Sequence, residues 1–502
     1  MSRGKVVVVG AGLSGLSAGC YARMNDFEVV ILEQNSKPGG VAASWRRGGF
    51  QIDAGVHFLW GFRDGTATHD LFRELGILPQ NGVTPLKRLE VVDEDSQHTL
   101  NLASSLDELE REMKDISPQD VSPIEDLIDA ATDLDPDAMG DMLSKPADLV
   151  GPLERIASLW GSRRYARYLS GPWKRTSSEF AAQFKNAFLR RSVESLFYPE
   201  TPAWFAVFML SMASKGRLGI LSEGSNGLVR SLVKRFENLG GHLRYQCLAE
   251  KVLVDGDRAK GVRSVDGTVE SADSVISTAD GRQVLYKMLD GSYLNDEIDS
   301  RYRTWQLFRP LVSVSIGSAT PFEEAPHLRT IFLKEPLAVG TGRISTMIVR
   351  NLGNNPHFAP PGKGLLHVEL ESDWQFWYKL RALDGRMYEA EKARIAKEVI
   401  SRLERHHPGL KDLVEMVDVS TPFSTWRYTL NQEGSYEGWL PTPETIRAKT
   451  IRTLPGLKDF YMAGQWVMVG GGVPPCLFSG KHAVQLLCRR NGHSFHATAP
   501  AL

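Results

Sequence analysis

The sequence predicts an α/β fold built on a buried parallel sheet, and two stretches near the N-terminus support this. Residues 5–9 are a Lys followed by four Val, a run typical of a strand covered on both faces. Gly10, Gly12 and Gly15 follow at once and precede an apolar helical pattern that runs to about Arg23. Glycines at this spacing let the chain turn tightly, approach a pyrophosphate and pack the helix on the strand. The pattern is typical of a Rossmann-type nucleotide-binding domain.

The start of this helix provides a place for phosphate. Unpaired amides and the helix dipole favour negative charge there, so Leu13 and Ser14 are predicted to lie against a pyrophosphate. A second apolar run, residues 28–32, leads into Glu33. An acidic side chain at this distance can accept hydrogen bonds from an adenosine ribose. Glu33 and the adjoining Gln34 are therefore candidate cofactor-binding residues.

The segment after Glu33 indicates that the cofactor is a flavin and not a nicotinamide dinucleotide. Gly39 and Gly40 form a glycine pair, and residues 48–57 then read GGFQIDAGVH. The glycine pair and the F-x-x-D-x-G strand resemble the extended FAD fingerprint of the amine oxidase and phytoene desaturase superfamily. Val41 stands where many members carry Arg. The resemblance implies FAD contacts at Gly39, Gly40, Val41, Gly55, Val56 and His57.

A matching pattern stands near the other end of the chain. Residues 459–465 read DFYMAGQ, and residues 470–475 read GGGVPP. They resemble the C-terminal flavin motif of the family: a strand, a glycine loop and a helix, with prolines that suit a first helical turn. The helix start would face the flavin pyrimidine edge and stabilise its negative charge. The resemblance implies contacts at Gly464, Gln465, Gly471, Gly472, Val473 and Pro474, although Gln465 stands where some flavoproteins have Asp or Glu.

The middle of the chain extends the resemblance to nearly its whole length. Glycines and apolar runs between residues 224 and 280 follow the order seen in phytoene desaturases, carotenoid isomerases and retinol saturases. Asp266-Gly267 between two alternating runs predicts a hairpin, and so a small meander that feeds a strand back to the nucleotide sheet. The resemblance implies that backbone atoms near Val252 hold the adenine and that Thr278 contacts the cofactor.

Composition limits the remaining classes. The 502 residues are 42% hydrophobic and 24% charged with a net charge of −1, which gives no global attraction to nucleic acid. The four cysteines, Cys20, Cys247, Cys476 and Cys488, lack metal-finger spacing and fit a reducing, cytoplasmic compartment. No metal cluster, removable signal peptide or membrane-spanning run is expected. Nor does a second complete dinucleotide fingerprint appear, so an NAD(P)H domain is not expected.

The predicted domains are discontinuous. Residues 1–100, 215–290 and 450–490 are expected to form the FAD-binding domain. Residues 101–214 and 291–449 would form an α+β substrate domain, with a capping box at Ser105 and Glu108, strands at 311–316 and 366–370, and an amphipathic helix at 386–405. Residues 491–502 are polar and are expected to be a flexible tail.

One charged stretch, residues 155–191, contains Glu179 as its only acid and interleaves aromatic residues with cations. The cations are Arg155, Arg163, Arg164, Arg167, Lys174, Arg175, Lys185, Arg190 and Arg191. A basic stretch with aromatic anchors suits a membrane surface, and the alternative is a solvated basic face over core aromatics. Nucleic-acid binding is not favoured, because no binding fold accompanies the charge.

Three residues are candidates for chemistry. His57 follows the Asp53-Ala54-Gly55 strand, where family folds bring the chain beside the isoalloxazine, and a histidine there can donate a hydrogen bond or move a proton. The alternative is a buried structural histidine. Arg427 and Tyr428 resemble the R-Y-T segment of phytoene desaturases, which implies a place on the substrate cavity.

These features predict an FAD-dependent oxidoreductase that acts on carbon–carbon bonds of a lipophilic substrate, by desaturation, saturation or redox-neutral isomerisation. A flavin amine oxidase acting on a C–N bond is the enzyme alternative, less favoured because no SGGC-type cysteine for covalent flavin is found. A lipid-binding protein like Rab GDP-dissociation inhibitors is the alternative of another class. The substrate, the electron partner and the oligomeric state stay open.

Overall fold

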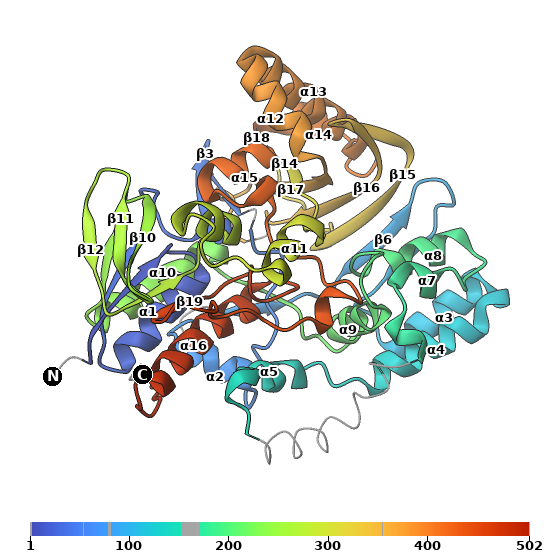
Figure 1. Ribbon diagram of the computed structural model, residues 1–502. Helices are drawn as coiled ribbons and strands as arrows, with labels where there is room; N and C mark the ends of the chain where they lie inside the picture. Colours follow the sequence, from blue (N-terminus) through green and yellow to red (C-terminus); the bar gives the residue numbers. More distant parts are fainter. Residues whose placement is uncertain are drawn as a thin grey trace.

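A computed structural model describes residues 3–53, 55–78, 82–151, 168, 171–353 and 355–500. The predicted α/β fold, with a Rossmann-type part and a second α+β part, is confirmed. In Figure 1 the Rossmann-type part lies at the lower left with both termini, a helix-capped sheet lies at the top, and a helical lobe lies at the lower right. The domain boundaries drawn from the sequence stay predictions.

The Rossmann-type part is built on a five-stranded parallel sheet. Its strands, in spatial order, are β19 (Phe460–Met462), β13 (Ser274–Ser277), β1 (Lys5–Val9), β2 (Glu28–Leu32) and β9 (His242–Arg244). At its centre Val8 pairs with Ile31 on one side and with Ile276 on the other. Segments from the two ends and the middle of the chain thus meet in one sheet.

Side chains of β1 alternate between two cores. Val6 and Val8 pack in a core with helices, whereas Val7 and Val9 pack in a core on the other face. The helices of the first core are α1 (Leu13–Met24), α10 (Gly224–Asn238) and α16 (Val473–Arg490). The other face is covered by β10 (Ala249–Asp255), β11 (Arg258–Ser264), β12 (Val269–Ser271), the π-helix η7 (Gln283–Met288) and α11 (Asp296–Thr304). The predicted meander is confirmed, with Gly267 at φ +84° in its turn.

A seven-stranded sheet forms the second part. Its order is β18 (Val414–Ser420), β14 (Leu311–Ser318), β17 (Gly364–Glu371), β16 (Gly342–Asn351), β15 (Leu328–Val339), β6 (Leu89–Asp93) and β7 (Thr99–Asn101). All neighbours are antiparallel except β15 and β6. Its outer face packs against α12 (Trp374–Leu383), α13 (Gly385–Leu403) and α14 (Leu410–Leu413). The strands predicted at 311–316 and 366–370 and the helix at 386–405 are therefore present.

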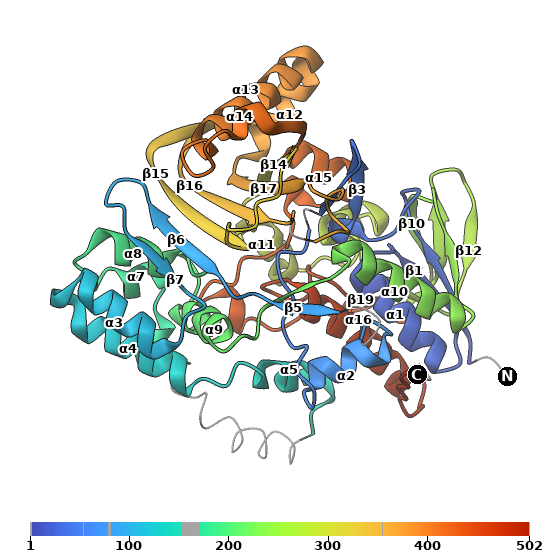
Figure 2. The ribbon, with the colours of Figure 1, turned by 180° about the vertical axis from the view of Figure 1, so that it is seen from behind.

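A helical lobe packs beside β6 and β7, as Figure 2 shows from behind. Its helices are α3 (Leu106–Ile116), α4 (Val121–Asp133), α7 (Ser177–Ala181), α8 (Ala187–Glu194) and α9 (Ala203–Ser214). The predicted capping box of Ser105 and Glu108 begins α3. Within the described part of the lobe, Trp173, Phe180 and Phe188 are buried, whereas the side chains of Lys174, Arg175, Lys185 and Arg190 are exposed. Residues 152–167, with Arg155, Arg163, Arg164 and Arg167, lie outside the described residues.

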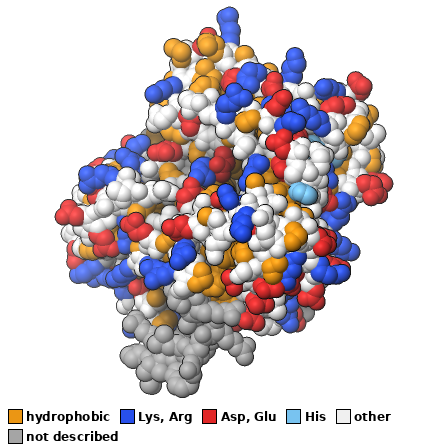
Figure 3. Space-filling view, turned by 90° about the vertical axis from the view of Figure 1, so that its right-hand side faces the viewer, with side chains coloured by type: hydrophobic (Ala, Val, Ile, Leu, Met, Phe, Trp, Pro, Cys, Tyr) orange, Lys and Arg blue, Asp and Glu red, His pale blue; other side chains and the backbone are white. Residues whose placement is uncertain are grey.

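Smaller elements complete the chain. They are the pairs β3 (Ser44–Arg47) with β4 (Phe50–Asp53) and β5 (Val83–Pro85) with β8 (Gly219–Leu221), the helices α2 (Ala67–Glu74), α5 (Ala138–Leu143) and α15 (Pro422–Thr429), and the short 3-10 turns η1 (Gly40–Ala42), η2 (Pro118–Asp120), η3 (Ala147–Leu149), η6 (Gly171–Lys174), η8 (Gln432–Gly434) and η9 (Thr445–Arg447). In the chain as described, no helix is both long and apolar enough to span a membrane. On the face in Figure 3, cationic and acidic side chains are interspersed rather than separated by sign.

The C-terminal segment, which the sequence predicts to be a flexible tail, contacts α1 and its C-cap Asn25. The backbone N–H of His496 donates to Asn25 Oδ1 at 2.8 Å, and Asn25 Nδ2 donates to the carbonyl of His496, also at 2.8 Å. Phe495 packs on Tyr21, with ring centroids 5.7 Å apart. The side-chain amide of Asn25 satisfies the backbone of His496, and the ring of Phe495 anchors the segment on Tyr21. The average polarity of the segment indicates neither contact.

Candidate active site

A large cavity of about 1330 Å³ lies between the two sheets. Gly10, Glu33 and Thr278, which follow the carboxyl ends of β1, β2 and β13, form part of its wall. Strands β15 to β17 and helix α9 form another part. Ligands of open α/β sheets bind beyond the carboxyl ends of the strands, so this cavity is the candidate active site.

The first glycine loop brings backbone to the cavity. Gly10 has φ +96°, and a Cβ on Gly15 would lie 1.9 Å from the carbonyl oxygen of Gly10, so α1 can cross β1 closely only with glycine there. Gly12 is the N-cap of α1 and has no side-chain cap, and a Cβ built on it would meet no atom within 4 Å. Free space and uncapped amides therefore coincide at the start of α1, as an anionic ligand requires.

Glu33 ties this loop together. Its Oε2 accepts from the backbone N–H of Ala11 at 2.9 Å, and its Oε1 accepts from the backbone N–H of Asn35 at 2.9 Å and from its Nδ2 at 2.8 Å. The carboxylate lines the cavity, and Oε2, which accepts one hydrogen bond, keeps capacity for a further donor. Gln34 Nε2 and Asn35 Nδ2 donate to the backbone carbonyl of Tyr428, at 2.7 and 2.8 Å. Tyr428 thus lies beside the end of the cavity that Glu33 marks.

The second glycine loop presents another helix start. Gly470, Gly471 and Gly472 have φ of +94°, +56° and +91°, and α16 then begins with no side-chain cap. Ser14 Oγ donates to the carbonyl of Cys476 at 2.8 Å, which joins the starts of α1 and α16. Two uncapped helix starts, the space at Gly12 and the Glu33 carboxylate form a donor and acceptor set that fits a flavin dinucleotide.

His57 lies in a buried charged cluster at the cavity wall. Its Nε2 lies 2.9 Å from Glu369 Oε1, and Arg350 Nη2 lies 2.9 Å from the same oxygen. Arg350 also donates to the carbonyl oxygens of Asp53 and Val56, at 2.9 and 3.1 Å. The ring of His57 stacks on Tyr436 with centroids 6.3 Å apart. Three strands and a loop therefore fix the position of the imidazole.

The surroundings of this cluster lower the pKa values of both Glu369 and His367. Burial by itself would raise the pKa of Glu369, but the neighbouring His57 and Arg350 lower it well below its ordinary value, so Glu369 is a carboxylate. Burial lowers the pKa of His367 to about 3, and its Nδ1 lies 2.8 Å from Ser315 Oγ. His367 is therefore neutral, and the negative charge of Glu369 interacts with His57 and Arg350.

The rest of the wall combines a few polar contacts with a wide apolar surface. The hydroxyls of Tyr198 and Tyr436 lie 2.6 Å apart, and Arg309 pairs with Glu200 and, at 3.3 Å, with Glu371. Apolar side chains follow along α9 and the facing strands: Trp204, Phe205, Phe208, Met209, Met212, Leu328, Phe332 and Ile348. Such a wall suits an elongated apolar ligand.

The structure places most predicted cofactor-binding residues on the cavity. These are Gly10, Gly12, Leu13, Ser14, Glu33, Gln34, Gly39, Gly40, Val41, Gly55, Val56, His57, Thr278, Gly464, Gln465, Gly471, Gly472 and Val473. Gly15 and Pro474 lie in the first turns of helices α1 and α16. Val252 is buried in the meander, next to Glu250 and Lys251, which line the cavity. Arg427 is exposed on α15. The roles assigned to these residues stay predictions.

Several residues of the site could not be identified from the sequence. Glu369 and Arg350 stand in the strand sequences LLHVELE and MIVRN. A charged residue in a strand usually faces solvent, so the sequence predicts exposure for both residues, although both are buried. The apolar residues around each of them are the only sign of burial in the sequence. Tyr436 and Glu437 belong to a loop with no motif. They reach the site only because the loop folds back over Gly471.

Comparison with known proteins agrees with this geometry. The sequence profile of the family described as "Flavin containing amine oxidoreductase" matches residues 13–488. The chain is 25% identical over 501 residues to a chloroplastic prolycopene isomerase of Daucus carota, covering 94% of this chain and 78% of that protein. It is 24% identical over 517 residues to a lycopene-forming phytoene desaturase of Pseudescherichia vulneris, covering 96% and 99%.

Solved structures show the same fold. An oxidoreductase from Methanosarcina mazei superposes with a TM-score of 0.63 at 17% identity and covers 96% of this chain and 100% of that chain. A Rab GDI from Plasmodium falciparum superposes with a TM-score of 0.54 at 10% identity, covering 99% of both chains. At these identities the likeness concerns the fold alone.

Proposed function

This chain belongs to the family of flavin containing amine oxidoreductases, and we propose that it is an FAD-dependent enzyme acting on carbon–carbon bonds of a lipophilic, polyene-like substrate. The reaction would be desaturation, saturation or redox-neutral isomerisation. The observation that carries this proposal is the cavity itself. It joins two uncapped helix starts and the Glu33 carboxylate to a wide apolar wall along α9.

The relatives support the choice of substrate class. A prolycopene isomerase and a phytoene desaturase, which by their names act on polyenes, align with nearly all of this chain. Trp204, Phe208 and Met212 on the cavity wall present hydrocarbon and ring surface that complements such a molecule. The family description names amine oxidoreductases, but the two relatives named above do not point to an amine.

The chain's own residues would do the following. The start of α1 would hold the pyrophosphate, Glu33 would accept from the adenosine ribose, and the start of α16 would hold the flavin ring system. The bound flavin supplies the hydride chemistry. Glu369 orients His57 through Nε2, which leaves Nδ1 to hydrogen-bond or exchange a proton with the ligand. The apolar wall holds the substrate and excludes water.

Anaerobic reduction of the purified protein tests the reaction. A stoichiometric flavin spectrum is expected. The oxidised enzyme should convert a polyene if the reaction is desaturation, and a quinone would then reoxidise the flavin. The reduced enzyme should convert a polyene if the reaction is saturation or isomerisation. Reduction of the oxidised flavin by an amine, with no effect of polyenes, would instead identify an amine oxidase. Colourless protein that binds prenylated partners would identify a lipid-binding protein.

The flavin should be released when the protein is denatured. Cys476 is the cysteine on the cavity wall, and burial raises the pKa of its thiol to about 12, so the thiol is not a nucleophile at neutral pH. Acid precipitation should leave FAD in the supernatant. Flavin absorbance in the washed pellet would contradict non-covalent binding.

Peripheral membrane contact and a cytoplasmic location stay predictions. If residues 155–191 bind a bilayer, the protein should sediment with anionic liposomes at low salt and detach as salt is raised. Replacing Arg163, Arg164 and Arg167 by Glu should abolish sedimentation and leave flavin content unchanged. Equal sedimentation with and without liposomes would favour a solvated basic face.

A further inference from the structure

The carboxyl of Glu437 is a cavity group that the proposed function does not use. Glu437 follows η8, between Tyr436 and Gly438, and lines the cavity. In the described part of the chain no hydrogen bond or ion pair reaches its carboxyl, whereas Glu369 on the same cavity wall lies 2.9 Å from His57 Nε2. Glu437 is half-buried, and its carboxyl faces the cavity without a protein partner, so a ligand group in this cavity is its expected partner.

The packing of the loop fixes where this carboxyl lies. A Cβ on Gly471 would come within 2.8 Å of the Cβ of Glu437, and a Cβ on Gly438 would come within 2.9 Å of the carbonyl oxygen of Gln465. The loop therefore rests directly on Gly471 and Gln465 of the C-terminal motif. Contact this close fixes the backbone and Cβ of Glu437 against the glycine loop.

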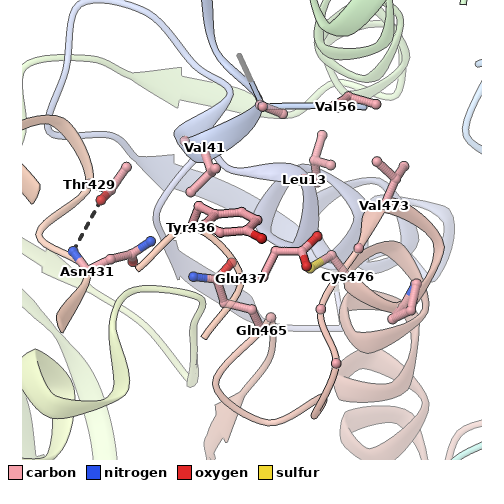
Figure 4. A pocket seen from close by; sticks show the side chains of 18 of the residues that line it. Leu13, Val41, Val56, Thr429, Asn431, Tyr436, Glu437, Gln465, Val473 and Cys476 are labelled. Atoms are coloured by element: carbon pink, nitrogen blue, oxygen red, sulfur yellow. Dashed lines mark hydrogen bonds between the residues drawn. The ribbon is translucent and has the colours of Figure 1, made fainter. Parts of the chain in front are cut away.

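The side chain points to the cofactor part of the cavity. In Figure 4 the carboxyl of Glu437 ends beside the sulfur of Cys476 at the start of α16, and Leu13 at the start of α1 projects into the same space. These two helix starts are joined by the hydrogen bond from Ser14 to Cys476. A ligand held by both helix starts must pass this carboxyl.

The ionisation of Glu437 suits contact with a polar neutral group. Burial, assisted by the negative charge of Glu369, raises the pKa of Glu437 to about 8, so the group is mostly protonated at pH 7. The other titratable groups that act on it are Tyr198, Tyr436 and Cys476, and none of these is a cation. A protonated carboxyl can donate one hydrogen bond and accept others.

We propose that Glu437 is a cofactor-binding residue whose carboxyl hydrogen-bonds oxygen or nitrogen atoms of the bound flavin, in its ribityl chain or its ring. The proposal rests on the proposed function, since it takes FAD to occupy this cavity. It adds a contact from a loop outside both glycine motifs. It also gives the flavin a neighbour whose charge changes slightly above neutral pH.

The test compares Glu437→Ala, Glu437→Gln and the control Glu433→Gln, an exposed residue of the same loop that does not line the cavity. Binding of FAD to each apoprotein is followed by quenching of flavin fluorescence. Glu437→Ala should weaken FAD binding about 3- to 10-fold, the scale of one hydrogen bond. Glu437→Gln, which still donates and accepts, should stay within about threefold, and Glu433→Gln should match the wild type.

A pH titration of the bound flavin gives a second readout. The visible spectrum of the wild type should shift with a midpoint near pH 8, and Glu437→Gln should remove this shift while circular dichroism shows an intact fold. If Glu437→Ala does not fold, the FAD affinity and the pH titration of Glu437→Gln test the proposal instead. Unchanged affinity with an unchanged titration in the variants would overturn the inference. A wild type that takes up no flavin would overturn the proposed function instead.

Discussion

The two ends of the cavity are built by different means. At the nucleotide end, backbone amides of two helix starts and one carboxylate, Glu33, are placed by glycines of fixed spacing. At the substrate end, side chains from β14 to β17, α9 and a loop meet across the second sheet. Backbone can be placed by a short motif. Side chains from distant segments can be placed only by the whole fold.

This difference predicts opposite sensitivities to substitution. At the nucleotide end, substitutions that add side-chain volume should abolish cofactor binding, because binding requires a close approach of the backbone and open space for the ligand. The substrate end should fail through lost charge or lost hydrogen bonds, because its function is the position of His57 and its neighbours. Four pairs of variants test the contrast.

The largest effect should come from Gly15→Val compared with Gly12→Val. A side chain on Gly15 collides with the carbonyl of Gly10, 1.9 Å from its Cβ, so α1 must leave β1 at a cost of about 3 kcal/mol or more. Gly12 has φ −73° and free space, so Gly12→Val should fold and lose only the flavin. Thermal unfolding and flavin absorbance separate the two. Stoichiometric flavin in Gly12→Val would refute the role of this space.

Glu369→Gln should cost about 3 kcal/mol at pH 7, because it leaves Arg350 buried without its anion. The control Glu371→Gln lies on the same strand with its side chain 43% exposed and should cost much less. Since the folded pKa of Glu369 lies below the ordinary 4.5, its stabilisation is complete above that pH and is lost as pH falls through the folded pKa. Urea unfolding at several pH values measures this, and equal stability of both variants at pH 7 would contradict it.

His57→Ala should keep FAD and reduce turnover by about 100-fold or more if the imidazole acts in the reaction. His57→Gln retains a hydrogen bond but cannot shuttle a proton, so it separates positioning from proton transfer. For a hydrocarbon substrate we expect the milder result in His57→Gln, because such a substrate offers no heteroatom to deprotonate. Unchanged turnover in both variants would make His57 a structural residue.

The smallest effect should come from Tyr428→Phe and Tyr428→Ala. The backbone carbonyl of Tyr428, and not its side chain, accepts from Gln34 and Asn35, and the residue is 59% exposed. FAD affinity and turnover should therefore stay within about twofold of the wild type. A tenfold loss of turnover with normal FAD binding would support the catalytic role predicted for Tyr428 from the sequence.

The same contrast explains how much could be predicted. The β1 strand, the glycine loop, Glu33 and the start of α16 could be predicted, because each depends on residues close in sequence. Arg350, Glu369 and Glu437 could not, since their burial depends on which strand or loop covers them. The contact of His496 with Asn25 joins the two ends of the chain and has no local signature either.

The spatial order of the parallel sheet also constrains the timing of assembly. β1 pairs directly with β13, and β13 pairs with β19, whose residues are 460–462. At roughly 5–20 residues per second, a ribosome needs roughly 20 to 90 s to pass from the first strand to the last. During that interval the sheet has an open edge and α16 does not yet exist, so flavin can be captured only after synthesis is nearly complete. Chains that terminate before residue 473 should therefore emerge without cofactor and depend on chaperones for solubility.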